Sequence, residues 1–278
     1  MNPSQEKHVI EAILASGVKI PPMPAVMLEF MTLEKDPDAS LDKYCAILNR
    51  DAALTGALFR VVNSPLFGGR RVDNMQRALA TLGVKNAGAI VRSESMRRTL
   101  HDVRYVTFMT LLWGRLDAIA ALSARVVRRV RVPQVPTDLV YLLGIFHDAG
   151  LAVLCKRFES YARAFGHFDV WPDLLALDEA HQTSHAVVGQ MLARNWQLPP
   201  GLVQAIRHHH EPEAFEALPE MVVKLILVLQ MALHLYNRGH GQADAEWDRV
   251  WRDQVLQRLG LSPEALAEAE ADLLDDPA

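Results

Sequence analysis

Apolar side chains recur every three to four positions along most of the chain, which is the spacing of one buried face of an α-helix. Several helix ends carry matching capping residues: Asn74 precedes and Gly83 follows one apolar repeat, and Ser262 with Pro263 opens another. No run combines strict alternation with hairpin turn chemistry. The pattern therefore predicts an all-α protein with helices near 4–16, 24–34, 40–49, 51–62, 74–82, 84–99 and 107–130, followed by shorter ones.

Composition and charge limit the number of domains, the kinds of partner and the redox compartment of such a protein. The 278 residues are half hydrophobic, which is enough for two domains with full cores. With 29 basic and 33 acidic residues the net charge is −4, so the broad positive field of a nucleic-acid-binding protein is missing and we expect no nucleic-acid partner. Only Cys45 and Cys155 are present, too few for a disulfide framework, which favours a reducing compartment.

A membrane location is also not expected from the sequence. The N-terminal segment 1–17 is too polar for a secretory signal, and the most apolar stretch, Leu225 to Asn237, is too short between its flanking charges to span a bilayer. We therefore predict a cytoplasmic protein.

Histidines gather in one part of the chain. Seven of the eleven fall between residues 147 and 210, namely His147, His167, His181, His185, His208, His209 and His210. Their concentration in one half, together with its more acidic character, suggests two lobes of different kinds. We place the boundary at 1–105 and 106–278.

The pair His147-Asp148 follows an apolar helix, 141–146, and precedes Gly150. An imidazole beside a carboxylate suits a divalent metal, and an Asp can bridge two ions. The alternative is structural, with His147 capping the last carbonyls of its helix and Asp148 capping the next helix.

Two later clusters offer further imidazoles. His181 and His185 share a helix face only if the helix covers both. His181 is better explained as a solvent-facing polar residue in a loop, so His185 is the stronger candidate. Gly189, one turn after His185, leaves room for another helix or a ligand. In the run His208-His209-His210, successive side chains diverge by about 100°, so all three cannot face one site.

The order of these motifs resembles the HD superfamily of metal-dependent phosphohydrolases, and the N-terminal half resembles its HDOD branch. The pair His209-His210 with Glu211, and the segment Trp196-Gln-Leu-Pro199, fit the same family. The N-terminal matches to the HDOD pattern are Pro21, Pro22, Pro24, Asp51, Leu54, Thr55, Leu58, Asn63, Ser64, Ala78, Leu82 and Gly83, while Ala52 departs from the usual Pro. The resemblance covers about residues 20–236 and implies a two-lobed fold, with an N-terminal helical bundle packed on an HD-like helical domain.

The resemblance implies a metal set of His147, Asp148, His185, His209 and His210, and also shows departures from it. An early ligand is missing where the chain reads Trp113-Gly-Arg-Leu-Asp117, in which Asp117 is a weak substitute. A late Asp is replaced by Gln230, and the Lys that often follows the HD pair is Leu151. A first-row ion normally wants four to six donors and an open position for water.

These departures favour a non-catalytic signal-transduction protein without catalytic residues. Its degenerate site would hold at most a divalent metal such as Fe, Mn, Mg, Zn or Ni. The alternative is an active metal-dependent phosphodiesterase or phosphohydrolase. The resemblance also implies signalling proteins as partners: receiver, kinase or cyclase/phosphodiesterase modules. We expect them to bind the N-terminal lobe or its junction with the second lobe, where a turn after Asn63 carries Leu66 and Phe67.

Overall fold

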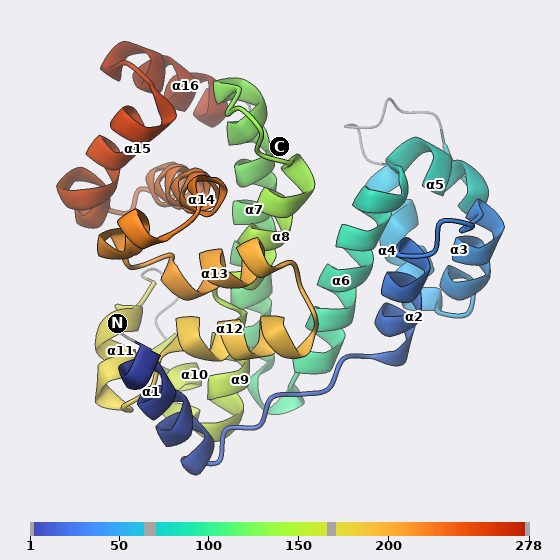
Figure 1. Cartoon of the computed structure of the whole chain (residues 1–278), viewed down its shortest axis with the longest axis horizontal. Helices are drawn as coiled ribbons and strands as arrows, with labels where there is room; N and C mark the ends of the chain where they lie inside the picture. The colour runs from blue at the N-terminus through green and yellow to red at the C-terminus, as the bar shows by residue number, and fades with distance from the viewer. Residues whose placement is uncertain (1–2, 64–70, 166–170, 276–278) are drawn as a thin grey trace. The chain divides into compact units, whose positions relative to one another are not determined.

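The structure is a computed structural model that describes residues 3–63, 71–165 and 171–275, and the side chains from residue 7 onward (Figure 1). Every regular element in these ranges is helical, which confirms the predicted all-α class. Ser64, Leu66 and Phe67 of the N-terminal motif, and His167, lie outside the described residues.

The chain forms two compact units. One is Pro21–His101, and the other combines Met1–Ile20 with Asp102–Ala278. The change of unit at 101/102 lies close to the expected 105/106 boundary, but residues 1–20 group with the C-terminal residues instead of the N-terminal lobe. The carbonyl of Ser16, just after α1 (Pro3–Ala15), accepts a hydrogen bond from Nε of Arg157, and such a long-range contact has no local sequence signal.

The smaller unit has five helices at the predicted positions: α2 (Ala25–Glu34), α3 (Leu41–Leu48), α4 (Ala52–Val62), α5 (Met75–Leu82) and α6 (Val84–Leu100). Their starts are set by capping side chains. Ser40, Asp51 and Asn74 each accept a backbone N–H of the helix that follows. The side chain of Asn63 bonds both the N–H and the C=O of Val72, and so closes the intervening segment. These motif residues therefore have structural roles.

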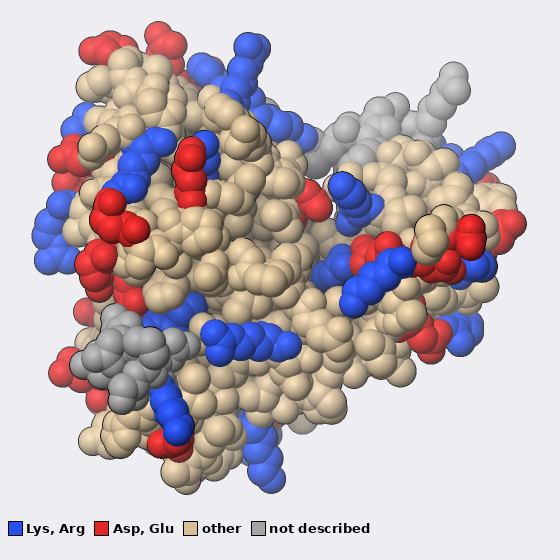
Figure 2. All heavy atoms as spheres, viewed as in Figure 1, with Lys and Arg blue, Asp and Glu red and all other residues tan. Residues whose placement is uncertain are grey.

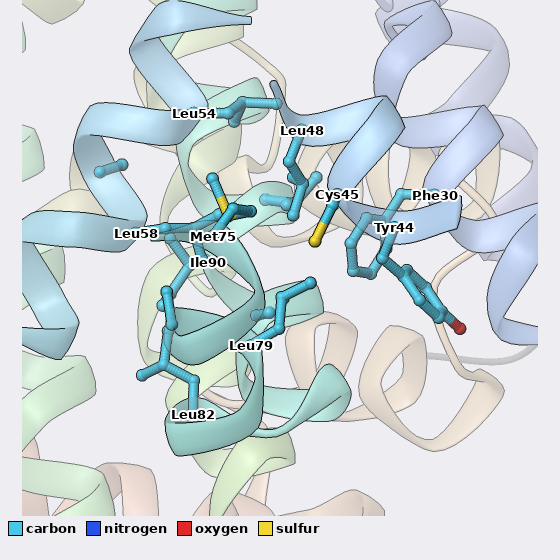
Figure 3. Close-up of a cluster of buried hydrophobic side chains, with 14 of the residues drawn as sticks. Phe30, Tyr44, Cys45, Leu48, Leu54, Leu58, Met75, Leu79, Leu82 and Ile90 are labelled. Atoms are coloured by element: carbon cyan, nitrogen blue, oxygen red, sulfur yellow. The ribbon is translucent and has the colours of Figure 1, made fainter. Parts of the chain in front are cut away.

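The core of this unit is shown in Figure 3, where side chains from several helices meet. Phe30 and Tyr44 pack with ring centroids 5.0 Å apart, and Leu48, Leu54 and Leu58 are fully buried. Burying side chains of this size stabilises the folded state by about 1.5–3 kcal/mol each.

The larger unit is built around α7 (Val106–Val130), which packs along α8 (Thr137–Phe146) and α14 (Glu220–Gly239). Gly144 allows the close approach of α7 and α8, because a Cβ there would lie 2.4 Å from Cα of Ala120. The remaining helical elements are η2 (Val103–Tyr105), α9 (Ala149–Arg157), α10 (Glu159–Ala164), α11 (Leu174–Ala180), α12 (His185–Asn195), α13 (Pro200–His208), η3 (Pro212–Ala217), η4 (Trp247–Trp251), α15 (Arg252–Leu259) and α16 (Pro263–Asp275).

Among the residues that the structure describes, three helical segments are long and apolar enough to cross a membrane by length and composition: Val103–Val130, Thr137–Arg157 and Glu220–Gly239. The expectation that the 225–237 stretch is too short is wrong on this criterion, because α14 extends beyond Lys224 and Arg238 and reaches 20 residues. Between 50% and 83% of the most apolar window of each segment is buried inside the protein, so helix packing accounts for much of this hydrophobicity.

Candidate metal centre

Helix ends position the polar residues of the larger unit that the sequence predicts as metal ligands. His147 and Asp148 form the turn between α8 and α9, and His185 is the first residue of α12. His209 and His210 directly follow α13. Side chains at helix ends can point into the space where several helices meet, and Figure 1 shows α9, α12 and α13 stacked as neighbours.

Four imidazoles gather around the carboxylate of Asp148. Its Oδ1 lies 3.3 Å from Nε2 of His185 and 3.5 Å from Nε2 of His209, and its Oδ2 lies 3.4 Å from Nε2 of His147. Nε2 of His210 is 3.2 Å from Nε2 of His185. One ligand atom from each of Asp148, His185, His209 and His210 lies within 4.8 Å of the others. The sequence-predicted residues are thus brought together, and we call these five the His–Asp cluster.

Three of the imidazoles are oriented by their other nitrogen. Nδ1 of His147 donates to the carbonyl of Gly144 at 2.9 Å, and Nδ1 of His209 donates to the carbonyl of Ile206 at 2.7 Å. Nδ1 of His185 donates to Oδ2 of Asp178 at 2.7 Å. In the neutral imidazoles this assignment places the lone pair on Nε2, which is the usual arrangement of metal-binding histidines.

Several buried atoms of the cluster lack hydrogen-bond partners among the described residues. They are Nε2 of His147, Nε2 of His209, Nδ1 of His210 and Oδ1 of Asp148. Buried polar atoms are normally paired, so unpaired atoms gathered around one carboxylate fit a bound ligand. Imidazole nitrogens with one carboxylate oxygen suit Zn, Fe, Ni or Mn, and the residues present therefore fit a divalent ion.

The cluster concentrates charge on two groups. Burial raises the pKa of Asp148, but His147, His185 and His209 outweigh it and hold this pKa well below its ordinary value. Burial lowers the pKa of His185, yet hydrogen bonds and charge from Asp148 and Asp178 raise it to about 10. Burial also lowers the pKa of His209 and of His210. In the metal-free protein the proton therefore stays on His185, between two carboxylates, and an ion must displace it.

Two glycines allow this close packing. A Cβ at Gly150 would lie 2.1 Å from the carbonyl oxygen of His185, so α9 touches α12 through backbone. A Cβ at Gly189 would meet Ile206 of α13 at 3.0 Å. Gly189 thus makes room for neighbouring helices, one of the two uses expected from its spacing.

The positions that the resemblance marks as altered contribute no ligand. Leu116 is fully buried on α7, and Asp117 is not part of the metal-ligating group found among the described residues. The amide nitrogen of Gln230 donates to the backbone carbonyl of His209. Gln230 therefore holds the peptide beside a candidate ligand.

The other histidines that the sequence singled out lie elsewhere. His181 ends α11, where its ring nitrogens contact Ser160 and the carbonyl of Leu177. His208 pairs with Glu211 at 2.9 Å, so the three adjacent histidines do not all face one site, as expected.

Sequence reasoning missed two residues of the site. Asp178 lies seven positions before His185, and a lone acid at that distance has no motif to mark it. Arg115 belongs to the segment Trp113–Asp117, in which the sequence shows no metal ligand. It lines a cavity of about 610 Å³ together with His147, Asp148, His210 and Gln230.

Comparisons with known proteins agree with this architecture. Residues 20–212 match the family model of the HDOD domain. An uncharacterised protein of Treponema pallidum (strain Nichols) is 24% identical over 208 residues, which are 72% of this chain and 40% of that protein, so the chain spans less than half the length of this relative.

Solved structures resemble the chain over nearly its whole length. An HDOD domain protein of unknown function from Geobacter sulfurreducens has a TM-score of 0.70 at 19% identity, with 98% of each chain covered. A protein of Shewanella amazonensis SB2B, provisionally named a metal-dependent phosphohydrolase, has a TM-score of 0.67 at 16% identity, covering 98% of this chain and 97% of its own. One from Marinobacter aquaeolei VT8, provisionally named a signal transduction protein, has a TM-score of 0.72 at 18% identity, covering 98% of this chain and 63% of its own. At these identities the likeness shows the fold.

Proposed function

Because the chain belongs to the HDOD family, we propose that it is a non-catalytic regulatory protein that acts through protein or ligand binding, with a His–Asp cluster that holds a divalent ion without hydrolysing phosphoesters. The observation that carries the proposal is the role of Gln230. Its amide donates to a backbone carbonyl, where the resemblance expects a carboxylate ligand. An ion in this cluster has one carboxylate, that of Asp148, to balance its charge.

The ion would be held by Asp148, His185, His209 and His210, with His147 beside them. It would supply a positive charge and Lewis acidity at the wall of the cavity. Because these residues come from the α8–α9 turn, α12 and the end of α13, a bound ion also ties three segments together and stabilises the folded state.

Metal analysis of the purified chain tests the first half of the proposal. We expect up to one Mn²⁺, Fe²⁺ or Zn²⁺ per chain, with binding lost in His185→Ala and retained in His181→Ala, a matched control outside the cluster. The second half is tested by phosphodiesterase assays with a cyclic dinucleotide and bis(p-nitrophenyl) phosphate, each with added Mn²⁺, Fe²⁺ or Mg²⁺. We expect no turnover. A chain that binds no metal in any of these forms contradicts the proposed ion.

An active metal-dependent phosphohydrolase is the second candidate function. The observation that favours it is that two unpaired buried nitrogens, Nε2 of His147 and Nε2 of His209, lie 3.4 and 3.5 Å from the carboxylate of Asp148. Hydrolysis that requires metal and disappears in both His147→Ala and Asp148→Ala would establish this function and refute the non-catalytic one.

We further propose that signalling proteins bind the smaller unit. The residues that match the HDOD pattern most densely, from Pro21 to Gly83, lie in this unit, which supports an interaction role for it. Leu28 and Leu41 are 47% and 41% exposed there. Crosslinking in the native cell, with mass spectrometry of the linked peptides, is expected to place a receiver, kinase or cyclase/phosphodiesterase protein on this unit; links confined to residues 106–278 contradict it.

We also retain a cytoplasmic location without nucleic-acid or membrane partners as part of the proposal. Both cysteines are free and buried, which suits a reducing compartment. On the face that Figure 2 shows, basic and acidic side chains are interspersed, and such a surface lacks the continuous positive field that attracts phosphate backbones. Binding of a random-sequence DNA duplex at low salt is the direct check, and none is expected.

A further inference from the structure

The turn after α13 determines which of three adjacent histidines face the His–Asp cluster. Helix α13 ends at His208, and His209 and His210 follow it directly. Because successive side chains on a helical turn diverge by about 100°, the direction of each ring depends on how this turn is held. Nε2 of His209 lies 3.5 Å from Oδ1 of Asp148. Nε2 of His210 lies 3.2 Å from Nε2 of His185, so the second and third histidines face the cluster.

His210 differs from the other imidazoles of the cluster in what holds its ring. Nδ1 of each of the other three bonds a backbone carbonyl or a carboxylate, which fixes the ring. Nδ1 of His210 is buried and has no hydrogen-bond partner among the described residues. The backbone that carries His210 therefore directs its ring, and the residues that hold this backbone determine where Nε2 points.

The residue after His210 holds this turn with both oxygens of its carboxylate. Oε1 of Glu211 accepts a hydrogen bond from Arg207 at 2.8 Å, and Oε2 accepts one from Nδ1 of His208 at 2.9 Å. The backbone N–H of Glu211 also donates to the carbonyl of His208 at 2.9 Å. These bonds connect Glu211 back to the last turn of α13, across the two histidines that face the cluster.

The ion pair within this turn is largely buried. The side chain of Arg207 is 2% exposed and that of Glu211 is 20% exposed. Water and salt screen such a pair little, and separating it would leave a buried charge uncompensated, so the pair holds the turn firmly. The same carboxylate engages His208, which is not part of the metal-ligating group found among the described residues.

We propose that Glu211 is a positioning residue of the metal centre, which directs His210 toward the cluster and keeps His208 out of it. The positioning role rests on the divalent ion proposed above and concerns the same site. Glu211 acts through the backbone of the turn, because its own oxygens are occupied by Arg207 and His208. A run of three histidines does not by itself specify which two face a site, and the bonds of Glu211 make that choice.

Two variants of the full chain test this role. Glu211→Gln keeps the size of the side chain but presents an N–H group in place of one accepting oxygen. Arg207→Met/Glu211→Leu replaces the buried pair with apolar side chains, an exchange that folded proteins often tolerate. Glu213→Gln changes an exposed acid two positions away and is the matched control.

The first readout needs no metal. The chain is stripped with EDTA and labelled with diethyl pyrocarbonate, which modifies accessible neutral imidazoles, and mass spectrometry locates the label. The rate at His210 is expressed relative to that at His147, which is buried on a different turn, because global unfolding would raise both rates. We expect this relative rate to rise about threefold or more in both variants, since the ring of His210 then leaves the cluster more often.

The second readout is calorimetric titration with Mn²⁺, in which both variants are expected to bind about tenfold more weakly than the parent protein. Glu213→Gln is expected to stay within about twofold of the parent in both measurements.

Equal relative labelling of His210 in the parent and in the folded variants overturns the positioning role, and so does a parental Mn²⁺ affinity in these variants. If circular dichroism shows that Glu211→Gln does not fold, the apolar double variant decides. A parent protein that takes up no Mn²⁺ refutes the metal centre, and the metal-free labelling still decides whether Glu211 directs His210.

Discussion

Nδ1 of His185 lies 2.7 Å from Oδ2 of Asp178, a carboxylate seven residues earlier on the end of α11. The same oxygen accepts the backbone N–H of His185 at 2.9 Å, and Oδ1 accepts the hydroxyl of Tyr161 at 2.8 Å. All three residues are buried. Asp178 therefore fixes both the first turn of α12 and the ring orientation of the most central imidazole in the cluster.

Asp178→Asn is expected to lower the affinity for Mn²⁺ by about 10- to 100-fold, because a neutral amide oxygen accepts Nδ1–H of His185 more weakly than the carboxylate does and makes Nε2 of His185 a poorer donor to the ion. Titration calorimetry with Mn²⁺ measures the change. Glu179→Gln, at the exposed neighbouring position, is the matched control and is expected to match the parent protein. Equal affinity of Asp178→Asn and the parent would show that Asp178 does not orient a ligand.

Gly150→Ala is expected to lower the free energy of unfolding by about 3 kcal/mol, because its Cβ would overlap the carbonyl of His185 and backbone cannot yield as a side chain does. It also separates Asp148 from His185 and weakens Mn²⁺ binding. The control is Gly114→Ala in α7, where no heavy atom lies within 4 Å of the added Cβ and a gain of about 1 kcal/mol is expected. Urea unfolding of both variants measures these changes. Equal free energies of unfolding for Gly150→Ala and Gly114→Ala would refute the close contact between α9 and α12.

Gln230→Asp places a carboxylate in the cluster in exchange for the amide that bonds the carbonyl of His209. In the metal-free protein we expect a lower melting temperature, because a second buried negative charge then faces Asp148. Excess Mn²⁺ is expected to raise the melting temperature more than in the parent, since the ion gains a charged ligand. Gln230→Leu removes the amide without adding charge. We therefore expect it to lower the melting temperature of the metal-free protein as well, but not to increase the rise in melting temperature that Mn²⁺ causes. A Mn²⁺ effect no larger in the Asp variant than in the Leu variant counts against this geometry.

The thiol of Cys155 provides a pH test of the core. Burial raises its pKa to about 12, from an ordinary value of 9.0. Above pH 9 the unfolded chain loses this proton while the folded chain keeps it, so ionisation stabilises the unfolded state and the free energy of unfolding falls as pH rises from 9 toward 12. At pH 8 the folded protein is expected not to react with Ellman's reagent, whereas the unfolded protein reacts at both cysteines.

Cys45→Ser isolates Cys155 for these measurements. Between pH 9 and 10.5 the free energy of unfolding of this variant should fall by up to about 1.4 kcal/mol per pH unit more steeply than that of Cys45→Ser/Cys155→Ala. Rapid labelling of folded Cys45→Ser at pH 8 would show that Cys155 is accessible.

The sequence by itself predicted the helices of the first 130 residues, and its resemblance to a known family named the histidines and the Asp of the cluster. The starts of α4 and α5 follow from Asp51 and Asn74, because a capping side chain satisfies N–H groups only two or three residues away. The apolar spacing predicted α7 to within a residue of its start, since side chains three and four positions apart share a helix face. The His–Asp motifs carry enough local pattern to name His147, Asp148 and His185 before any geometry is known.

Only the tertiary structure showed what surrounds these residues. That Gln230 turns its amide to the carbonyl of His209, that Asp178 holds His185, and that Arg115 reaches the cavity all depend on how α7, α11 and α14 pack. The grouping of residues 1–20 with the larger unit likewise depends on contacts between segments far apart in the sequence. Periodicity and caps report interactions within about one helical turn, whereas these contacts join residues up to about 120 positions apart, and their geometry is determined by side-chain packing between helices.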